Sequence, residues 1–251
     1  MVAQIETRFD APGPQPNGMQ ATLEGLWILD QFTNHVALVS FEGQLLRSFG
    51  TASDRGSGIT DSGTALWVAS TYSREILKVD RVSGATLAAF PTPGASQTGA
   101  HGLEWRDNML WMAVPPSATI YQVDVAHGFV VRHALPAPGN RPHGIAWVDD
   151  DLWCVETSHR ALYRLNPKDG SVIDQIDIPK EHPEPHGMTY WDGAFWYCDA
   201  TTRAVCRIRL SYSLSIQASL GGSLGHRAGA GDGTHAGSEE TRSATKEAPA
   251  A

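Results

Sequence analysis

A motif that recurs five times at nearly constant spacing constrains the fold of this chain more than any other feature. Each copy has a residue X followed by glycine and an apolar residue, and a tryptophan ten residues after X. The X residues are Asn17, Ser57, His101, His143 and His186, and the tryptophans are Trp27, Trp67, Trp111, Trp153 and Trp196. Successive copies start 40, 44, 42 and 43 residues apart. Strand-rich repeats of this length are typical of β-propeller blades.

Each repeat is also predicted to contain four strands. In the first, strands are expected just after Asn17 and over residues 25–29, 36–39 and 45–49, with Gly43 at the last turn, where a hairpin needs a positive φ. The fifth repeat lacks this glycine and a fourth strand, whereas residues 4–9 form a strand without a neighbour. We therefore predict an all-β, five-bladed β-propeller with four antiparallel strands per blade, whose ring the N-terminal strand closes.

The composition divides the chain into two parts. Residues 1–210 carry the repeats and are expected to form the propeller, with residues 4–9 completing the last blade. Residues 211–251 are rich in Gly, Ser, Ala and Thr and show no apolar period. A segment of this kind buries too little apolar surface to offset its chain entropy, so we expect a disordered tail.

Charge and cysteine content narrow the choice of partners. The net charge of −8 argues against a nucleic-acid or anionic-membrane partner, and no apolar run is long enough to span a membrane. The three cysteines are odd in number and lack CxxC spacing, which favours buried thiols in a reducing compartment. We expect a cytoplasmic monomer that binds a small-molecule substrate.

The repeats also predict where chemistry could occur. The X residues should form a ring at one mouth of the central channel, and a second row, three residues after each tryptophan, should face it. This second row consists of Asp30, Ser70, Val114, Glu156 and Asp199. Three histidines and three acids, with Glu184 nearby, could hold a divalent metal, and an imidazole beside a carboxylate could act as a general base. Tyr72 and His159 are expected on loops at the same mouth.

Each of these residues also has a purely structural interpretation. Each His-Gly pair could hydrogen-bond to the incoming loop of a neighbouring blade, as a contact that defines the repeat. Glu156 and Asp199 could pair with Arg160 or Arg203. The five repeat tryptophans are expected to be core residues between blades.

Two repeats resemble those of virginiamycin B lyase (streptogramin lyase). These are Pro142-His-Gly-Ile with Leu152-Trp-Cys-Val-Glu, and Pro185-His-Gly-Met with Phe195-Trp-Tyr-Cys-Asp. They are more loosely similar to gluconolactonase-type propellers and to propeller glutamine cyclotransferases. The lyase family opens a cyclic depsipeptide by elimination across an ester bond, using a histidine base and Mg²⁺. The resemblance implies His186 as the base, His143 as an assisting residue, and Glu184 and Asp199 as metal ligands.

This chain departs from that family in two respects. The lyase has seven blades, whereas five are predicted here, so a narrower pocket is expected. A third histidine, His101, joins His143 and His186, and such a set suits Zn²⁺, Mn²⁺ or Fe²⁺ better than Mg²⁺. Glu156 is a further candidate ligand. The residues expected to contact substrate are Asn17, Ser57, Asp30, Tyr72 and His159.

Three functions follow from these features. The first is a metal-dependent lyase or hydrolase acting on a small ester or lactone. The second is a propeller that only binds a ligand or a protein. The third is a glutamine cyclotransferase-like activity, which would use an acid such as Glu156 to hold an amine.

Overall fold

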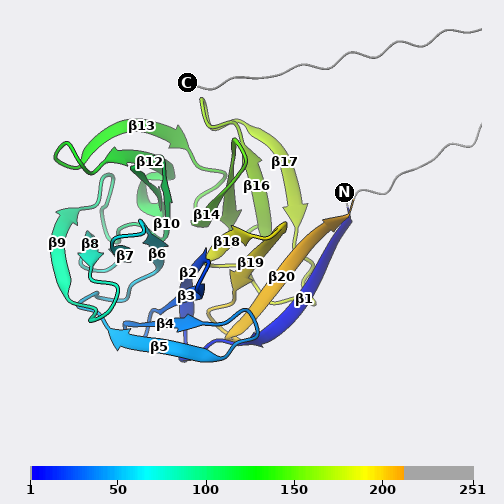
Figure 1. The fold of residues 1–251 in the computed structure, drawn as a ribbon. Coiled ribbons are helices and arrows are strands. Elements are labelled where there is room, and N and C mark those ends of the chain that lie inside the picture. The colour runs from blue at the N-terminus through cyan, green and yellow to red at the C-terminus, as the bar shows by residue number, and fades with distance from the viewer. Residues whose placement is uncertain (1, 212–251) are drawn as a thin grey trace, which may run out of the picture. The chain divides into compact units, whose positions relative to one another are not determined.

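The computed structural model describes residues 2–211, which form a ring of five four-stranded antiparallel sheets (Figure 1). This arrangement confirms the predicted five-bladed β-propeller. Apart from Ser211, the low-complexity segment predicted from residue 211 onward falls outside the described residues. Within residues 2–211, no helix has the length and apolar character needed to cross a membrane.

The blades follow one another along the chain. Blade one consists of β2 (Pro16–Thr22), β3 (Gly25–Asp30), β4 (His35–Val39) and β5 (Leu45–Gly50). Blade two consists of β6 (Gly58–Asp61), β7 (Leu66–Ser70), β8 (Glu75–Val79) and β9 (Thr86–Pro91). Blade three consists of β10 (Gly102–Arg106), β11 (Met109–Val114), β12 (Thr119–Asp124) and β13 (Val130–Pro136), with the short 3-10 helix η1 (Pro115–Ser117) after β11. Blade four consists of β14 (Pro142–Val148), β15 (Asp151–Glu156), β16 (Ala161–Leu165) and β17 (Val172–Asp177).

Blade five joins the two ends of the described chain. It consists of β18 (Met188–Trp191), β19 (Ala194–Cys198), β20 (Ala204–Ser211) and β1 (Val2–Asp10). β1 lies antiparallel to β20, with Ile5 opposite Ile208 and Asp10 opposite Ala204 (Figure 1). The predicted closure by the N-terminal strand is therefore confirmed, and this strand covers an edge of β20 that would otherwise be exposed.

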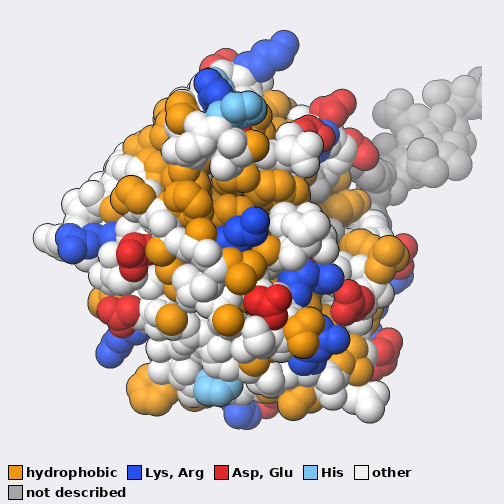
Figure 2. Space-filling view, turned by 60° about the vertical axis from the view of Figure 1, so that its left-hand side comes forward, with side chains coloured by type: hydrophobic (Ala, Val, Ile, Leu, Met, Phe, Trp, Pro, Cys, Tyr) orange, Lys and Arg blue, Asp and Glu red, His pale blue; other side chains and the backbone are white. Residues whose placement is uncertain are grey.

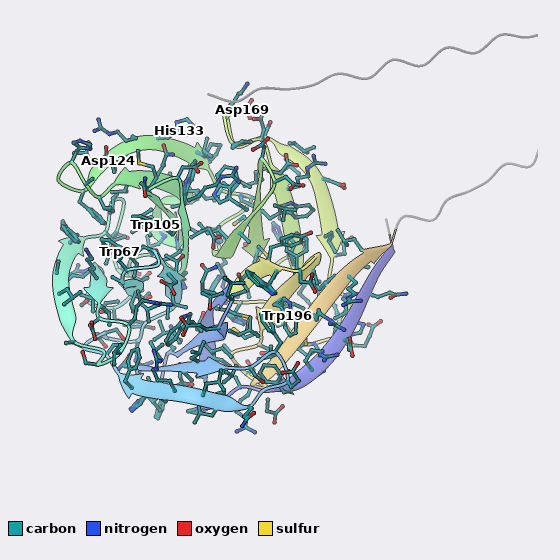
Figure 3. All side chains as sticks on the ribbon, viewed as in Figure 1. Trp67, Trp105, Asp124, His133, Asp169 and Trp196 are labelled. Carbon is teal, nitrogen blue, oxygen red and sulfur yellow. The ribbon has the colours of Figure 1, made fainter. Side chains whose placement is uncertain are left out.

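The core lies between the blades. The five repeat tryptophans are at most 5% exposed, and each apolar cluster combines side chains from two successive blades. Trp67 of blade two, for example, stacks on Trp105 of blade three, with ring centroids 5.9 Å apart (Figure 3). Cys154, Cys198 and Cys206 are buried and free. On the flank of the ring, apolar and charged side chains are mixed (Figure 2).

A ring of glycines closes the channel. The glycine after each X residue lies against the backbone of the next blade, so a Cβ atom on Gly18 would come 2.9 Å from the Ser57 carbonyl oxygen. A Cβ atom on Gly58 would lie 2.8 Å from the His101 carbonyl oxygen. A Cβ atom on Gly187 of blade five would lie 2.5 Å from the carbonyl oxygen of Asn17 in blade one. Only glycine permits such a close approach of backbones. The atoms that line the channel here leave no room for a water molecule.

Candidate functional site: a histidine cluster at the channel mouth

The first and second strands of each blade fix the X residues at the mouth of the channel. The backbone amide of X donates to a carbonyl oxygen near the end of the second strand: Ser57 to Ala69, His101 to Ala113 and His186 to Cys198. The glycine that follows X packs against the next blade, and the side chains of X meet one another at the mouth, directly between histidines or through Gln31. The three histidines come from consecutive blades and therefore become neighbours.

The imidazoles of His101 and His143 are hydrogen-bonded to each other. His101 Nδ1 lies 3.1 Å from His143 Nε2, and His143 Nδ1 lies 3.0 Å from the carbonyl oxygen of Arg141. A carbonyl oxygen can only accept, so His143 carries its proton on Nδ1 and accepts the Nδ1 proton of His101 at Nε2. Both nitrogens of His143 are thus engaged, and the lone pair of His101 lies on Nε2.

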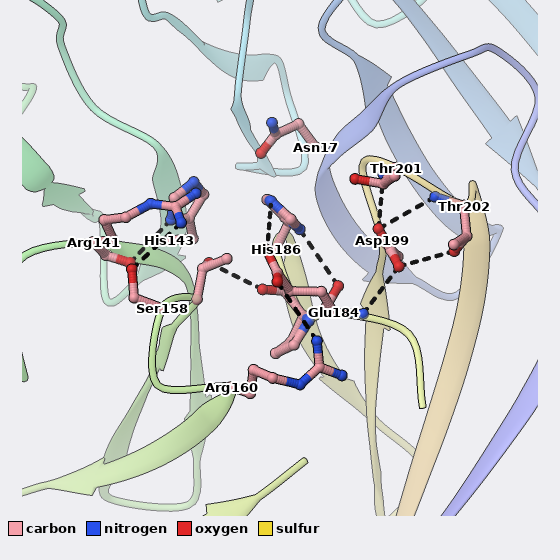
Figure 4. Close-up of polar contacts among 12 residues, drawn as sticks. Asn17, Arg141, His143, Ser158, Arg160, Glu184, His186, Asp199, Thr201 and Thr202 are labelled. Atoms are coloured by element: carbon pink, nitrogen blue, oxygen red, sulfur yellow. Dashed lines mark hydrogen bonds and ion pairs between the residues drawn. The ribbon is translucent and has the colours of Figure 1, made fainter. Parts of the chain in front are cut away.

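His186 stands beside His143 with a different set of partners. The two ring centroids are 5.2 Å apart and nearly perpendicular. Nδ1 of His186 faces the carbonyl oxygen of Glu184 at 3.4 Å, which leaves the lone pair on Nε2. This Nε2 lies 3.7 Å from the Glu184 carboxylate, which is 38% exposed (Figure 4). A proton that arrived on Nε2 would therefore meet a negative charge.

All three imidazoles are held in the neutral form. Burial, together with the positive charge of Arg141, lowers the pKa of His101 to about 4. Burial also moves the pKa of His143 well below its usual value of 6.5. The pKa of His186 is lowered by burial as well, although its contacts with Glu184 act in the opposite direction. Neutral imidazoles can accept protons near pH 7.

The acids of the second row accept hydrogen bonds from backbone amides. Asp199 accepts hydrogen bonds from the amides of Glu184 and Thr201, and Glu156 accepts them from the amides of Arg141 and His159. Asp30 accepts the amide of Gln15 in the same way, and Ser70 accepts that of Asp54. These side chains thus tie the incoming loop to the turn after the second strand in four of the five blades, and Val114 takes this position in blade three. This row positions the residues that stand two or three places before X.

The alternative partners considered for Glu156 and Asp199 were wrong. Arg160 lies 3.5 Å from Glu184, and Arg203 lies 3.0 Å from Asp10. The structural alternative for the His-Gly pairs is met in part, because the Gly144 amide donates to the carbonyl oxygen of His186 in the incoming loop of blade five. The imidazoles themselves bond to their own incoming loops or to one another.

The other half of the ring is an amide and hydroxyl network. Gln31 accepts a hydrogen bond from Asn17 at 3.2 Å and donates to the Ser57 hydroxyl at 2.7 Å. Asn17 Oδ1 is buried and has no hydrogen-bond partner among the described residues. Such an orphan acceptor is a place where a ligand or water could donate. The backbone carbonyl oxygen of Asn17 lies against Gly187, the residue that follows His186, and both side chains are drawn in Figure 4.

Two residues predicted to shape the entrance lie against partners in their own blades. The Arg55 guanidinium lies 5.2 Å from the centre of the Tyr72 ring. His159 Nδ1 lies 3.0 Å from the Tyr163 hydroxyl. The structure brings neither side chain into the hydrogen-bonded histidine cluster.

The repeat pattern did not identify three residues at the mouth: Arg141, Arg160 and Gln31. Arg141 and Glu184 occupy the same position, two residues before X, in blades four and five. Arg160 donates to the carbonyl oxygens of Ile178 and Pro179 as well as pairing with Glu184. These polar residues were visible in the sequence, but the residue types at their positions differ from blade to blade, so periodicity could not identify them.

The metal implied by the family resemblance can be tested against these donors. Within residues 2–211, no cluster of three or more His, Cys, Asp and Glu side chains has an arrangement able to hold a metal ion. A three-histidine site does not fit this arrangement, because both nitrogens of His143 already have partners. The Glu184 carboxylate and Asn17 Oδ1 are hard oxygen donors of the type that Mg²⁺ prefers, with waters completing its shell.

Known proteins share this fold. The glutaminyl cyclase of Myxococcus xanthus is similar to this chain with a TM-score of 0.68 and 12% identity, over 82% of this chain and 95% of that one. A catalytically inactive histidine-to-alanine variant of virginiamycin B lyase from Staphylococcus aureus, solved with quinupristin, gives 0.51 and 21%, over 78% and 66%. A streptogramin B lyase gives 0.52 and 17%, over 84% and 74%.

Sequence comparison identifies the family. No curated protein sequence gives a significant match. The sequence profile of the virginiamycin B lyase family, however, matches residues 4–218, which include all five repeats and the whole histidine cluster. The chain therefore belongs to the virginiamycin B lyase family.

Proposed function

We propose that this protein is a lyase that eliminates across the ester bond of a small ester or lactone, with His186 as the general base. The observation that carries the proposal is the state of His186, a neutral imidazole whose Nε2 lone pair lies at the channel mouth beside the Glu184 carboxylate. Membership of the virginiamycin B lyase family supports the same chemistry.

The reaction needs one proton transfer and no water. His186 Nε2 takes the proton from the carbon next to a carbonyl group, and the electron pair of that C–H bond forms a carbon–carbon double bond. The bond from the neighbouring carbon to the ester oxygen breaks, and the released carboxylate keeps its electrons. The Glu184 carboxylate stabilises the imidazolium that forms, because it lies 3.7 Å from Nε2.

The proposal includes a divalent metal that is held by few protein ligands. Glu184 and the orphaned Asn17 Oδ1 would supply protein oxygens for Mg²⁺. When bound, such an ion would stabilise negative charge on a carbonyl oxygen. Arg160 and Asp199 hold Glu184 in place from its side chain and its backbone respectively.

The test is a screen of cyclic esters with and without added Mg²⁺, read by mass spectrometry. Elimination opens a ring without changing its mass, whereas hydrolysis adds the mass of one water. We expect ring opening at constant mass, and a loss of at least about a hundredfold in kcat for His186→Ala, since a general base contributes about that much. His35→Ala, which removes an exposed histidine on β4, is the matched control. Full activity of His186→Ala would refute the assignment.

A second candidate function is cyclisation of N-terminal glutamine, because glutaminyl cyclase aligns over nearly its whole length. That activity would release ammonia from a glutamine peptide, which the same mass measurement detects. The acid suggested for this role was Glu156, but that side chain is fully buried and accepts two backbone amides. If neither esters nor glutamine peptides react, a binding-only propeller becomes the better explanation.

A further inference from the structure

Arg141 places a cation beside the histidine cluster. It lies two residues before His143, and its exposed side chain stands next to the His143 imidazole (Figure 4). Its position is fixed through the backbone: the amide donates to Glu156 at 2.8 Å, and the carbonyl oxygen accepts from Thr157 and from His143 Nδ1. The guanidinium is therefore attached to a rigid part of the mouth.

No carboxylate neutralises this guanidinium within residues 2–211. Its one hydrogen bond there is a 3.3 Å contact with the Ser158 hydroxyl, and it makes no ion pair. The nearby Glu156 carboxylate is occupied by backbone amides, and Glu184 pairs with Arg160. Other arginines on this side of the ring have partners: Arg203 pairs with Asp10, and Arg74 donates to a carbonyl oxygen of Ser96.

The surroundings favour a negative charge at this point. The charge of Arg141 contributes to lowering the pKa of all three histidines, so it is close enough to act on each ring. The imidazole rings are neutral, so they do not repel an anionic ligand. Since the chain as a whole carries a charge of −8, an anionic ligand could be held here only by a local cation.

We propose that Arg141 anchors a carboxylate of the ligand above the histidine cluster, so that the site takes carboxylate-bearing molecules. The planar guanidinium can offer two parallel N–H groups to one carboxylate. Taken with the proposed function, on which this last step rests, the substrate is an ester or lactone that also carries a free carboxylate. Arg141 positions it with the reacting carbon near His186.

The experiment measures binding, without any need for the true substrate. Acetate is titrated into the full chain near neutral pH while the histidine ring resonances are followed by NMR, and acetamide serves as the neutral analogue. We expect saturable shifts of the mouth histidines with acetate and none with acetamide. Arg141→Gln should weaken acetate binding about tenfold to a hundredfold, as expected for loss of a charged hydrogen-bonding partner. Arg141→Lys should fall between the two.

Arg209→Gln is the matched control, because Arg209 is exposed on β20 and makes no ion pair within residues 2–211. It should bind acetate as the unmodified protein does. Equal binding by Arg141→Gln, or no saturable shift in the unmodified protein, would overturn the anchor.

The two proposals can fail separately. His186→Ala should still bind acetate while losing ring opening. If His186→Ala keeps its activity, the proposed base is wrong and the anchor stands. If Arg141→Gln binds acetate normally while His186→Ala is inactive, the anchor is wrong and the base stands.

Discussion

At the scale of the residue, two kinds of polar side chain at the mouth of the channel differ in their hydrogen-bond partners. The acids of the second strands are saturated by backbone amides, as Asp199 is by those of Glu184 and Thr201. The imidazoles bond mainly to carbonyl oxygens and to one another, and they remain neutral. The acids thus stabilise the fold. The lone pairs of His101 Nε2 and His186 Nε2 and the charge of Arg141 remain available for a ligand.

The burial of His101 predicts that stability falls in mild acid. Its pKa is about 4 in the folded chain and returns to about 6.5 on unfolding, so the unfolded chain binds the proton more readily between these values. The free energy of unfolding is therefore highest above about pH 6.5 and decreases towards pH 4. At about 1.4 kcal/mol per pKa unit, His101 contributes about 3 kcal/mol to this loss.

Urea denaturation of the protein and of His101→Asn, at about pH 7.5 and pH 4.5, measures this contribution. The variant should lose less stability between the two pH values. His35→Asn, at an exposed site, should behave as the unmodified protein. A parallel pH dependence in all three proteins would show that His101 does not carry the effect.

At the scale of the element, the first strand of each blade is set by one glycine. A Cβ atom on Gly102 would lie within 3 Å of both the carbonyl oxygen and the carbonyl carbon of His143. Strands β10 and β14 could not come this close with any other residue. The same contact sets the distance between the His101 and His143 imidazoles, so the packing of these strands and the hydrogen bond at the mouth are coupled.

Gly102→Ala should therefore destabilise the fold strongly. We expect a loss of about 3 kcal/mol, the upper end of the usual cost of overpacking, because backbone atoms must move apart. Gly50→Ala is the matched control, since a Cβ there meets only the His35 ring at 3.7 Å. Thermal unfolding distinguishes the two variants, and similar melting temperatures would contradict the close approach.

At the scale of the whole molecule, closure of the ring depends on the pairing of β1 with β20. The two strands are paired from Val2 opposite Ser211 to Asp10 opposite Ala204, and Glu6 of β1 pairs with Arg207 of β20. Blade five also carries His186, which meets His143 of blade four. The histidine cluster therefore requires that blade five be held in the ring.

Deletion of residues 1–10 should abolish cooperative unfolding and expose the edge of β20. An exposed edge strand promotes association, so we expect oligomers by size-exclusion chromatography. A synthetic peptide of residues 1–12 added to the truncated chain should restore a monomeric, cooperative fold. A truncated chain that stays monomeric and unfolds like the full chain would show that closure does not depend on β1.

The sequence alone determined the architecture, because each blade repeats the same apolar, glycine and tryptophan positions. Five copies of Gly-apolar, each followed by Leu-Trp or, in the last repeat, Phe-Trp, indicate the same packing in every blade, and the missing fourth strand pointed to residues 4–9. The placement of His101, His143 and His186 at one mouth followed from the same repeat, since equivalent positions in a ring lie side by side.

Only the tertiary structure decided which of these groups remain available for chemistry. The partners of Asp199 and Glu156 are backbone amides, which every residue except proline possesses. No pattern of side chains could therefore predict which amides they bind. Arg141 lies outside the five-fold rows, and its lack of a counter-charge depends on where Glu156 and Glu184 find their partners. Whether a side chain is left without a protein partner depends on its distances to residues that differ from blade to blade. The repeat pattern carries no information about those distances.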